Sequence, residues 1–420
     1  MKFRLEELHD KFPEIHKSII IKADVLREGV RPSSLFREVA KWAASDSDIS
    51  FEWSHEKAHT EKDVEEEFRL LMPEIFYLRD ETIVKIILDS QSPYTIEKVD
   101  DKYMLFRDGQ IVEEVFFVHS PKWYFKRTKS GKLMNSVAFM RGLGCELGIV
   151  LLNHCEYWNT GEQCRYCNMG AHVEYMRSIG RKIPIFKPFE DIAEVAAESY
   201  KECGSRIAHW GGSGGSLLNR SKEAENYAKM IRTIKEAIGR RRDTLYGAVD
   251  TTAMENKDAV KIYEAGIEGI GHNLEVWDPK LFEITCPGKT RYVGRENWIN
   301  SLINDLNYWD QGKVQSSFVS GVEMVKPYGF KTIDDALEST LEGFEWLLTH
   351  GVAIKFNMWS PNPGSALYDK AQYLPPTEYW LRLGMGLHEL NKKYGMYPHP
   401  TMICYRDLTR SIFKDFYHLM

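Results

Sequence analysis

The sequence predicts an α/β fold, in which a partial or near-complete TIM-type barrel of six β/α units follows an N-terminal α+β module. From about residue 140 onward, short apolar runs alternate with amphipathic helical patterns in the order typical of a parallel sheet. Before about residue 130, helical patterns precede a group of strand patterns instead. The chain has 420 residues, of which 43% are hydrophobic, so it can bury the cores of both parts.

The N-terminal module is expected to span residues 1–130 and to act as a lid or an accessory domain. Residues 9–29 and 32–45 carry apolar side chains three and four positions apart, as amphipathic helices do. Residues 82–118 contain β-rich runs instead. The Asp108-Gly109 pair between two of these runs predicts a tight hairpin turn.

The barrel is expected to span residues 140–397, with a C-terminal extension over residues 398–420. Its strands are predicted at 147–155, 206–212, 244–251, 269–277, 314–322 and 353–360. Helical patterns lie between them at 189–204, 221–239, 255–266, 295–310 and 332–351. Because β/α crossovers are right-handed, the C-terminal ends of all strands should share one face, where ligand-binding loops gather.

Composition narrows the class of protein. The net charge is −6, and no apolar run is long enough to span a membrane. The first residues, MKFRLEELHDKF, are charged where a secretory signal needs an apolar run. Seven cysteines are far too few for a disulfide-stapled secreted domain of this length. We therefore expect a cytoplasmic protein with reduced thiols, and neither nucleic acid nor a membrane as partner.

Three of the seven cysteines crowd into the segment HCEYWNTGEQCRYCNMG, namely Cys155, Cys164 and Cys167. A structural zinc site would need a fourth ligand such as His154 or His172. A redox dithiol would use only the last two cysteines, and buried inert thiols fit poorly with such polar neighbours. An iron–sulfur cluster uses all three thiolates and leaves one iron without a protein ligand.

The other four cysteines are scattered along the chain and are expected to be small buried residues outside the site: Cys145, Cys203, Cys286 and Cys404.

The spacing Cys-x8-Cys-x2-Cys resembles the cluster loop of the radical S-adenosylmethionine superfamily, whose usual spacing is Cys-x3-Cys-x2-Cys. An aromatic residue usually precedes the last cysteine there, and Tyr166 fills that place. The longer first interval is a departure from the family pattern. The resemblance implies a 4Fe-4S cluster on the three thiolates, with S-adenosylmethionine chelating the open iron, in an oxygen-sensitive enzyme.

Two further segments resemble the biotin synthase-like group of the same superfamily. Gly211, Gly212 and Ser213 match a strand-end motif that receives the methionyl amine, although serine stands where the family often has an acid. In "GHNLEVW" and the following helix, the match implies that Asn273 and Glu275 bind the ribose hydroxyls. It also implies that Arg295 lies near the methionyl carboxylate.

The resemblance implies formation of a 5′-deoxyadenosyl radical that abstracts hydrogen from a small polar substrate, for rearrangement, carbon–carbon bond chemistry or methylation. Sulfur insertion is disfavoured because strands 244–251 and 314–322 contain no cysteine for a second cluster. A flavodoxin or ferredoxin is the expected reductant. The alternatives are an electron-transfer or other non-enzymatic iron–sulfur protein and a structural zinc protein.

The substrate is expected inside the barrel, against residues at the inward or C-terminal ends of the strands: His209, Trp210, Asp250, His272, Ser320, Glu323, Asn357 and Trp359.

Overall fold

The computed structural model describes residues 4–46, 71–141, 144, 146–178, 180, 183–239, 245–369, 374–396 and 410–420. Two of the scattered cysteines, Cys145 and Cys404, and most of the expected C-terminal extension lie outside the described residues.

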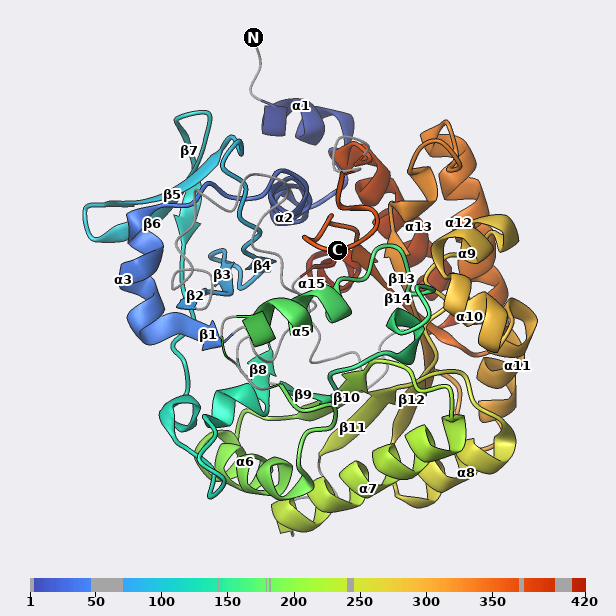
Figure 1. Ribbon diagram of the computed structural model, residues 1–420. Helices are drawn as coiled ribbons and strands as arrows, with labels where there is room; N and C mark the ends of the chain where they lie inside the picture. Colours follow the sequence, from blue (N-terminus) through green and yellow to red (C-terminus); the bar gives the residue numbers. More distant parts are fainter. Residues whose placement is uncertain are drawn as a thin grey trace.

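A curved seven-stranded sheet forms the centre of the molecule, in the order β14-β13-β12-β11-β10-β9-β8 (Figure 1). Strand β8 (Phe139–Arg141) is antiparallel to β9, and the other six strands are parallel. Those six are β9 (Glu146–Leu152), β10 (His209–Gly214), β11 (Tyr246–Asp250), β12 (Gly269–Gly271), β13 (Val314–Ser320) and β14 (Ala353–Met358). All six predicted strands are thus confirmed. Within the described ranges the sheet does not close, which makes it a partial barrel.

Helices cover the outer side of this sheet. They are α6 (Phe189–Cys203), α7 (Arg220–Ile238), α8 (Asn256–Glu264), α9 (Pro279–Thr285), α10 (Pro287–Tyr292), α11 (Arg295–Asp305), α12 (Ile333–Thr349) and α13 (Thr377–Tyr394). Helix α5 (Met169–Ser178) lies instead in the middle of the molecule, inside the curve of the sheet (Figure 1). Side chains of Asn219, Asp278 and Thr332 cap the first turns of α7, α9 and α12. The five predicted barrel helices are confirmed. The short helices α9 and α10 were not predicted, because seven and six residues are too few to show a helical period.

The two faces of the sheet differ in burial. On β14, Ile354 and Phe356 are buried, whereas Lys355 and Asn357 remain partly exposed. On β10, Trp210 is fully buried while its neighbours Gly211 and Ser213 are partly exposed. Because successive side chains of a strand point to opposite faces, one face is sealed by helices and the other stays accessible. The accessible inner face carries polar groups.

The N-terminal module contains α1 (Arg4–Lys11), α2 (Lys17–Glu28), α3 (Ser34–Ala43) and seven short strands, which are β1 (Ala44–Asp46), β2 (Leu71–Pro73), β3 (Ile75–Tyr77), β4 (Ile83–Lys85), β5 (Tyr94–Val99), β6 (Lys102–Arg107) and β7 (Gln110–Val115). The predicted hairpin between β6 and β7 is confirmed. Its turn residues Asp108 and Gly109 have φ of 50° and 77°, the left-handed geometry that such a turn requires.

This module contacts the helices on both sides of the open barrel. On α2, Lys22 pairs with Asp415 at 2.8 Å, and Asp24 accepts a hydrogen bond from Thr377 of α13 at 2.7 Å. At the module's other end, the backbone of Trp123 donates to Glu202 of α6. Asp415 belongs to the C-terminal helix α15 (Phe413–Leu419), so this ion pair connects the N-terminal module to the C-terminal helix. A role as a lid over the site stays a prediction.

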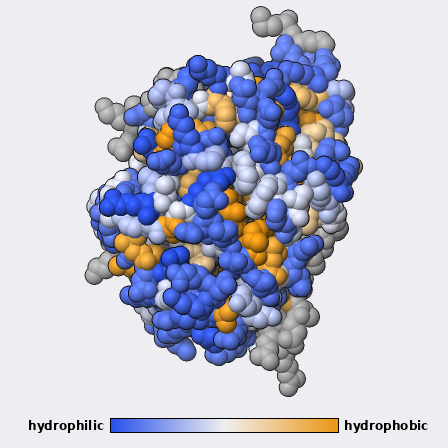
Figure 2. Space-filling view, turned by 90° about the vertical axis from the view of Figure 1, so that its right-hand side faces the viewer, coloured by the Kyte–Doolittle hydropathy of each residue, from blue (hydrophilic) through white to orange (hydrophobic). Residues whose placement is uncertain are grey.

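The outer face around α9 to α13 is mostly hydrophilic, with smaller hydrophobic areas between the polar ones (Figure 2). In the part of the chain that the structure describes, every helix is too short or too polar to cross a bilayer.

Candidate active site at the cysteine loop

The cysteine loop starts directly after β9, at the C-terminal end of the barrel. A short 3-10 turn, Glu156–Trp158, lies between the first two cysteines. Segments that follow β10, β12 and β14 each fasten it by a backbone hydrogen bond. These bonds run from Glu156 N to Ser216 O (2.8 Å), from Gly288 N to Glu162 O (2.8 Å) and from Leu367 N to Arg165 O (3.0 Å). Distant segments of the chain thus hold the loop in one conformation.

Glycines allow these segments to approach the loop closely. A Cβ atom on Gly215 would overlap the carbonyl oxygen of His154 and lie 2.8 Å from the Cα of Cys155. A Cβ atom on Gly288 would lie 2.6 Å from the carbonyl oxygen of Glu162. Both distances are too short for any side chain, so glycine is required at both positions.

The three thiols lie close enough to influence one another electrostatically. Burial raises the pKa of Cys155 to about 11 and that of Cys167 to about 12. The pKa of Cys164 is lowered, first by a hydrogen bond from Cys286 and then by the positive charge of Lys289. All five described cysteines are free thiols.

The groups around these thiols fit an iron–sulfur cluster. The backbone N–H of Met169 donates to the Cys167 sulfur at 3.5 Å. The buried indole N–H of Trp158 meets no acceptor with hydrogen-bond geometry, yet it lies near enough to Cys167 to lower that thiol's pKa. Donors of this kind stabilise thiolates and cluster sulfurs.

A single-ion site is not seen in the described ranges, where no three His, Cys, Asp or Glu side chains surround one point. A four-iron cluster takes its thiolates on separate irons, so its ligands do not converge on one point.

Glu275 lies just beyond β12 and is held in a strained conformation. Its φ of 70° is left-handed, which is uncommon for a residue with a side chain. Two backbone hydrogen bonds to β13 hold it, from Glu275 N to Ser317 O at 2.9 Å and from Val319 N to Glu275 O at 3.0 Å. Its negative charge acts on Cys164 and Tyr166, so the carboxylate faces the cysteine loop.

Lys289 of α10 binds this carboxylate. Its Nζ lies 2.7 Å from Glu275 Oε1 and 2.5 Å from the carbonyl oxygen of Asn273, and 4.4 Å from the centre of the Trp298 ring. Burial by itself lowers the pKa of Lys289, but the charge of Glu275 raises it above its ordinary value. The Asn273 side-chain oxygen accepts from Ser317 N at 3.1 Å. Asn273 and Glu275 therefore lie together beside the loop.

Tyr166 lies on the β14 side of the loop. It packs against an apolar cluster at the C-terminal end of β13 and β14, which includes Trp359 and Leu367. Buried polar atoms without a partner among the described residues surround this cluster, on Trp359, Ser360 and Ser365. A site that combines an apolar ring platform with unpaired hydrogen-bonding groups suits a heteroaromatic ligand.

Three of the predicted wall residues face the inner side of the sheet. Asp250 of β11 is bonded through both carboxylate oxygens to Nζ of Lys355 on β14, at 2.9 and 3.1 Å. The pair spans β12 and β13 and is 25% and 12% exposed. Asn357 lies on the same face. His209 is deep in the interior, 3.8 Å from Glu146, and burial lowers its pKa to about 4.

Four other predicted wall residues face the helices instead. Trp210 packs under Gly247 on the outer face, and His272 bonds to Asp305 of α11 at 2.8 Å. The carbonyl of Ser320 accepts from the Trp380 indole of α13 at 3.2 Å. Glu323 accepts from the Tyr379 hydroxyl, and burial raises its pKa to about 7. On the strands, alternation turned Trp210 and Ser320 away from the interior. His272 and Glu323 lie just beyond the strands and bond to α11 and α13.

The remaining predicted cofactor residues do not all face the inner side of the sheet. A Cβ on Gly211 would meet Glu146 on the inner face, whereas one on Gly212 would meet Met230 of α7. Ser213 is partly exposed on the Gly211 side. Arg295 donates to the carbonyl of Trp277 at 2.6 and 3.1 Å and stacks on its ring. Its expected contact with a methionyl carboxylate stays a prediction.

The structure adds residues that sequence reasoning missed. Cys286, expected to lie outside the site, is fully buried against Cys164. Glu223 of α7 accepts from the backbone of Leu217 and Thr252, both at 2.8 Å, and so joins the loops after β10 and β11. Burial raises the pKa of Glu223 to about 7. The sequence carries no signal for these residues, because lone cysteines and acids within helices are common.

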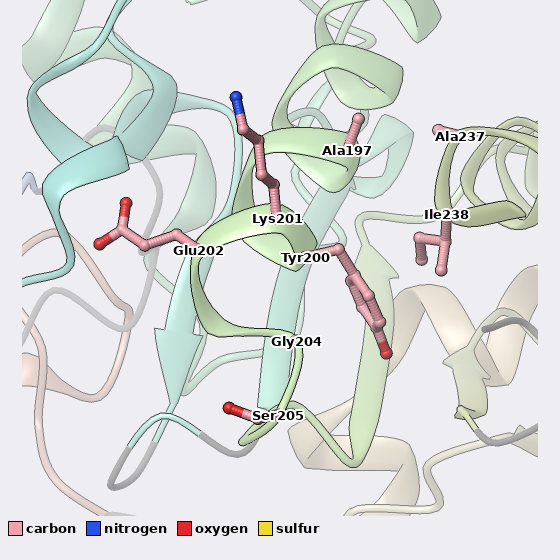
Figure 3. A pocket seen from close by; sticks show the side chains of 8 residues that line it. All are labelled: Ala197, Tyr200, Lys201, Glu202, Gly204, Ser205, Ala237 and Ile238. Carbon is pink, nitrogen blue, oxygen red and sulfur yellow. The ribbon is translucent and has the colours of Figure 1, made fainter. Parts of the chain in front are cut away.

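A surface hollow between the C-terminal ends of α6 and α7 lies at the opposite end of the barrel (Figure 3). It is lined by Ala197, Tyr200, Lys201, Glu202, Gly204, Ser205, Ala237 and Ile238. These residues precede β10 and β11, whereas the cysteine loop follows β9, so the hollow is not part of the site.

Comparison with known proteins gives one related sequence and several structures. The chain is similar to the bacteriochlorophyllide c C-7(1)-hydroxylase of Chlorobaculum limnaeum, with 24% identity over 314 residues, which covers 69% of this chain and 71% of that protein. No protein-family model matches the sequence.

Solved structures resemble it more loosely. A radical SAM methyltransferase from Sphaerobacter thermophilus aligns over 92% of this chain and 91% of its own, with 14% identity and a TM-score of 0.41. Methylornithine synthase aligns over 57% of this chain, with 16% identity and a TM-score of 0.40. That match spans 62% of the methylornithine synthase chain, which is less than two thirds of its length.

Proposed function

We propose that this chain, an enzyme of the radical S-adenosylmethionine superfamily, holds its 4Fe-4S cluster on Cys155, Cys164 and Cys167. The observation that carries the proposal is the loop itself. Three mutually interacting free thiols lie at the C-terminal end of the first parallel strand, beside the N–H donors of Met169 and Trp158. The three thiolates would hold the cluster, and its chemistry would be one-electron reduction of S-adenosylmethionine, which would release a 5′-deoxyadenosyl radical able to abstract hydrogen from the substrate.

The chain's own residues bind and orient the cosubstrate. Glu275 is a buried carboxylate beside the loop and suits two vicinal ribose hydroxyls, with Asn273 next to it. Tyr166 and the loop after β14 supply the apolar platform and the unpaired polar atoms that suit adenine. The backbone at Gly211 and Ser213, together with Arg295, is proposed for the methionyl group.

The substrate site is proposed on the inner face of the sheet, below the cysteine loop. Asp250, Lys355 and Asn357 are partly exposed there, whereas the outer face is sealed by helices. Charged and amide groups suit a small polar substrate. A barrel wall also keeps water from the reacting carbon.

The reaction class is proposed as rearrangement, carbon–carbon bond chemistry or methylation. The related protein from Chlorobaculum limnaeum is named as a hydroxylase, so hydroxylation of a carbon joins these candidates. Hydrogen abstraction is a suitable first step for each of them. A flavodoxin-like or ferredoxin-like reductant in the cytoplasm is proposed as the electron donor.

The decisive experiment is anaerobic reconstitution followed by metal and product analysis. We expect about four irons and four sulfides per chain, and release of 5′-deoxyadenosine from S-adenosylmethionine on reduction. A cluster without this cleavage would indicate the alternative, an electron-transfer iron–sulfur protein. Stoichiometric zinc without sulfide would indicate the structural zinc protein.

A further inference from the structure

Lys289 is a buried cation beside the cysteine loop, and neither the cluster nor the substrate site proposed above uses it. It is 6% exposed and lies on α10, a helix whose first residues contact the loop. A buried ammonium group is costly unless all of its donors are engaged. Such a residue at a functional site calls for an explanation.

Its surroundings engage the whole ammonium group. Two N–H donors bind Glu275 Oε1 at 2.7 Å and the carbonyl oxygen of Asn273 at 2.5 Å. The centre of the Trp298 ring lies 4.4 Å from Nζ, and its face stabilises the positive charge by a cation–π interaction. The two residues expected to bind ribose therefore share one cationic anchor. The N–H of Gly288, in the first turn of α10, binds the carbonyl oxygen of Glu162 in the cysteine loop. The anchor is therefore connected to the loop that carries the proposed cluster ligands.

Glu275 needs such an anchor for two reasons. Its backbone is left-handed, so the orientation of its side chain is not supported by regular strand geometry. Its carboxylate is also mostly buried, near Cys164, where an unpaired side chain would be costly. The hydrogen-bonded ion pair with Lys289 fixes the direction of the carboxylate and offsets the cost of burying it.

We propose that Lys289 is a positioning residue that holds the Glu275 carboxylate aimed at the ribose hydroxyls of S-adenosylmethionine, an inference that rests on the proposed function. Lys289 does not touch the cosubstrate. It acts through Glu275, and through the Asn273 carbonyl it fixes the backbone turn that carries both residues.

The test measures the Kd of S-adenosylmethionine for the reconstituted, cluster-containing protein under anaerobic conditions. Lys289→Met keeps the side-chain length without the charge, and Glu275→Gln keeps the shape without the charge. We expect each single variant to bind about tenfold more weakly. The double variant should bind no more weakly than Glu275→Gln alone, because Lys289 acts only through that residue. Lys289→Arg should recover part of the affinity.

A matched control is Lys22→Met, which removes the charge of another buried lysine bonded to an acid, outside the site. It should leave the Kd unchanged. Iron content measured on every variant separates cosubstrate binding from cluster loss. If Lys289→Met does not fold, the comparison rests on the double variant, which leaves no unpaired buried charge.

Normal affinity in Lys289→Met, or additive losses in the double variant, would overturn this inference alone. Normal affinity in Glu275→Gln would overturn it together with the ribose assignment. A wild-type protein that binds iron and sulfide but does not cleave S-adenosylmethionine would instead refute the proposed function.

Discussion

The two ends of the barrel differ in what surrounds them. At the N-terminal end of the strands, the hollow between α6 and α7 is lined by ordinary surface residues such as Lys201 and Ser205. At the C-terminal end, three loops clamp a set of free thiols, and buried N–H and hydroxyl groups stay unpaired. Unsatisfied polar groups and close backbone packing are therefore a better guide to the functional site than the visible hollow.

The largest expected effect is on the iron content, which should depend on the three clustered cysteines and not on a remote one. Replacing Cys155, Cys164 or Cys167 by alanine should reduce iron from about four per chain to near zero and abolish formation of 5′-deoxyadenosine. Cys203 lies at the end of α6, near the opposite end of the barrel, so Cys203→Ala should keep both. Iron and sulfide assays with the visible spectrum measure this difference. An intact cluster in any variant of the first group would remove that residue from the ligand set.

The next effect concerns glycine packing at the two ends. Gly215→Val should push the loop after β10 away from His154 and Cys155, lower the free energy of unfolding by about 1–3 kcal/mol and prevent full iron loading. Gly204, beside the hollow, has an ordinary φ of −60°, so Gly204→Ala should change the free energy of unfolding and the iron content little. Denaturant unfolding and iron content measure both. Equal losses of stability and iron in both variants would contradict the expectation that only the C-terminal end of the barrel needs glycine for close packing.

A smaller effect is expected from the buried acid that joins two loops at the C-terminal end. The folded-state pKa of Glu223 is raised to about 7, so the folded protein binds this proton more tightly than the unfolded chain. Stability is therefore greatest below the unfolded pKa and falls as pH rises towards 7, by up to about 3 kcal/mol. Glu223→Gln should flatten this part of the curve. Urea unfolding between pH 5 and about 8 tests the sign, and an unchanged slope would show that Glu223 stays ionised.

The smallest effect is expected at Cys286, which donates to the Cys164 sulfur. Cys286→Ala should keep the iron content but lower the reduction potential of the cluster, since hydrogen bonds to ligating sulfurs favour the reduced state. A potentiometric titration followed by electron paramagnetic resonance measures the shift. Loss of the cluster would instead mark Cys286 as a ligand.

Local patterns were enough to predict much of the barrel and the centre of its site. Apolar runs of strand length identified all six parallel strands, and the spacing of Cys155, Cys164 and Cys167 indicated one loop at the end of the first. The Asp108-Gly109 turn was also predictable, because a tight hairpin requires left-handed residues there. Each of these signals lies within about twenty neighbouring residues, which is the range over which backbone preference and side-chain period act.

Other features depended on contacts between distant segments. Strands buried under helices have no clear polar alternation, so the sequence could not show that Gly211 faces inward while Trp210 faces the helices. The predicted wall residues consequently divided between both faces.

The sequence by itself determined the order of the β/α units and the position of the cysteine loop after the first parallel strand, because both depend on local patterns along the chain. Only the tertiary structure decided that Lys289 binds Glu275, that Cys286 meets Cys164, and that α2 pairs with the C-terminal helix α15. The physical reason is that such pairs form when packing brings separate helices and loops together. Nothing in the local spacing of a lone lysine or cysteine encodes its distant partner.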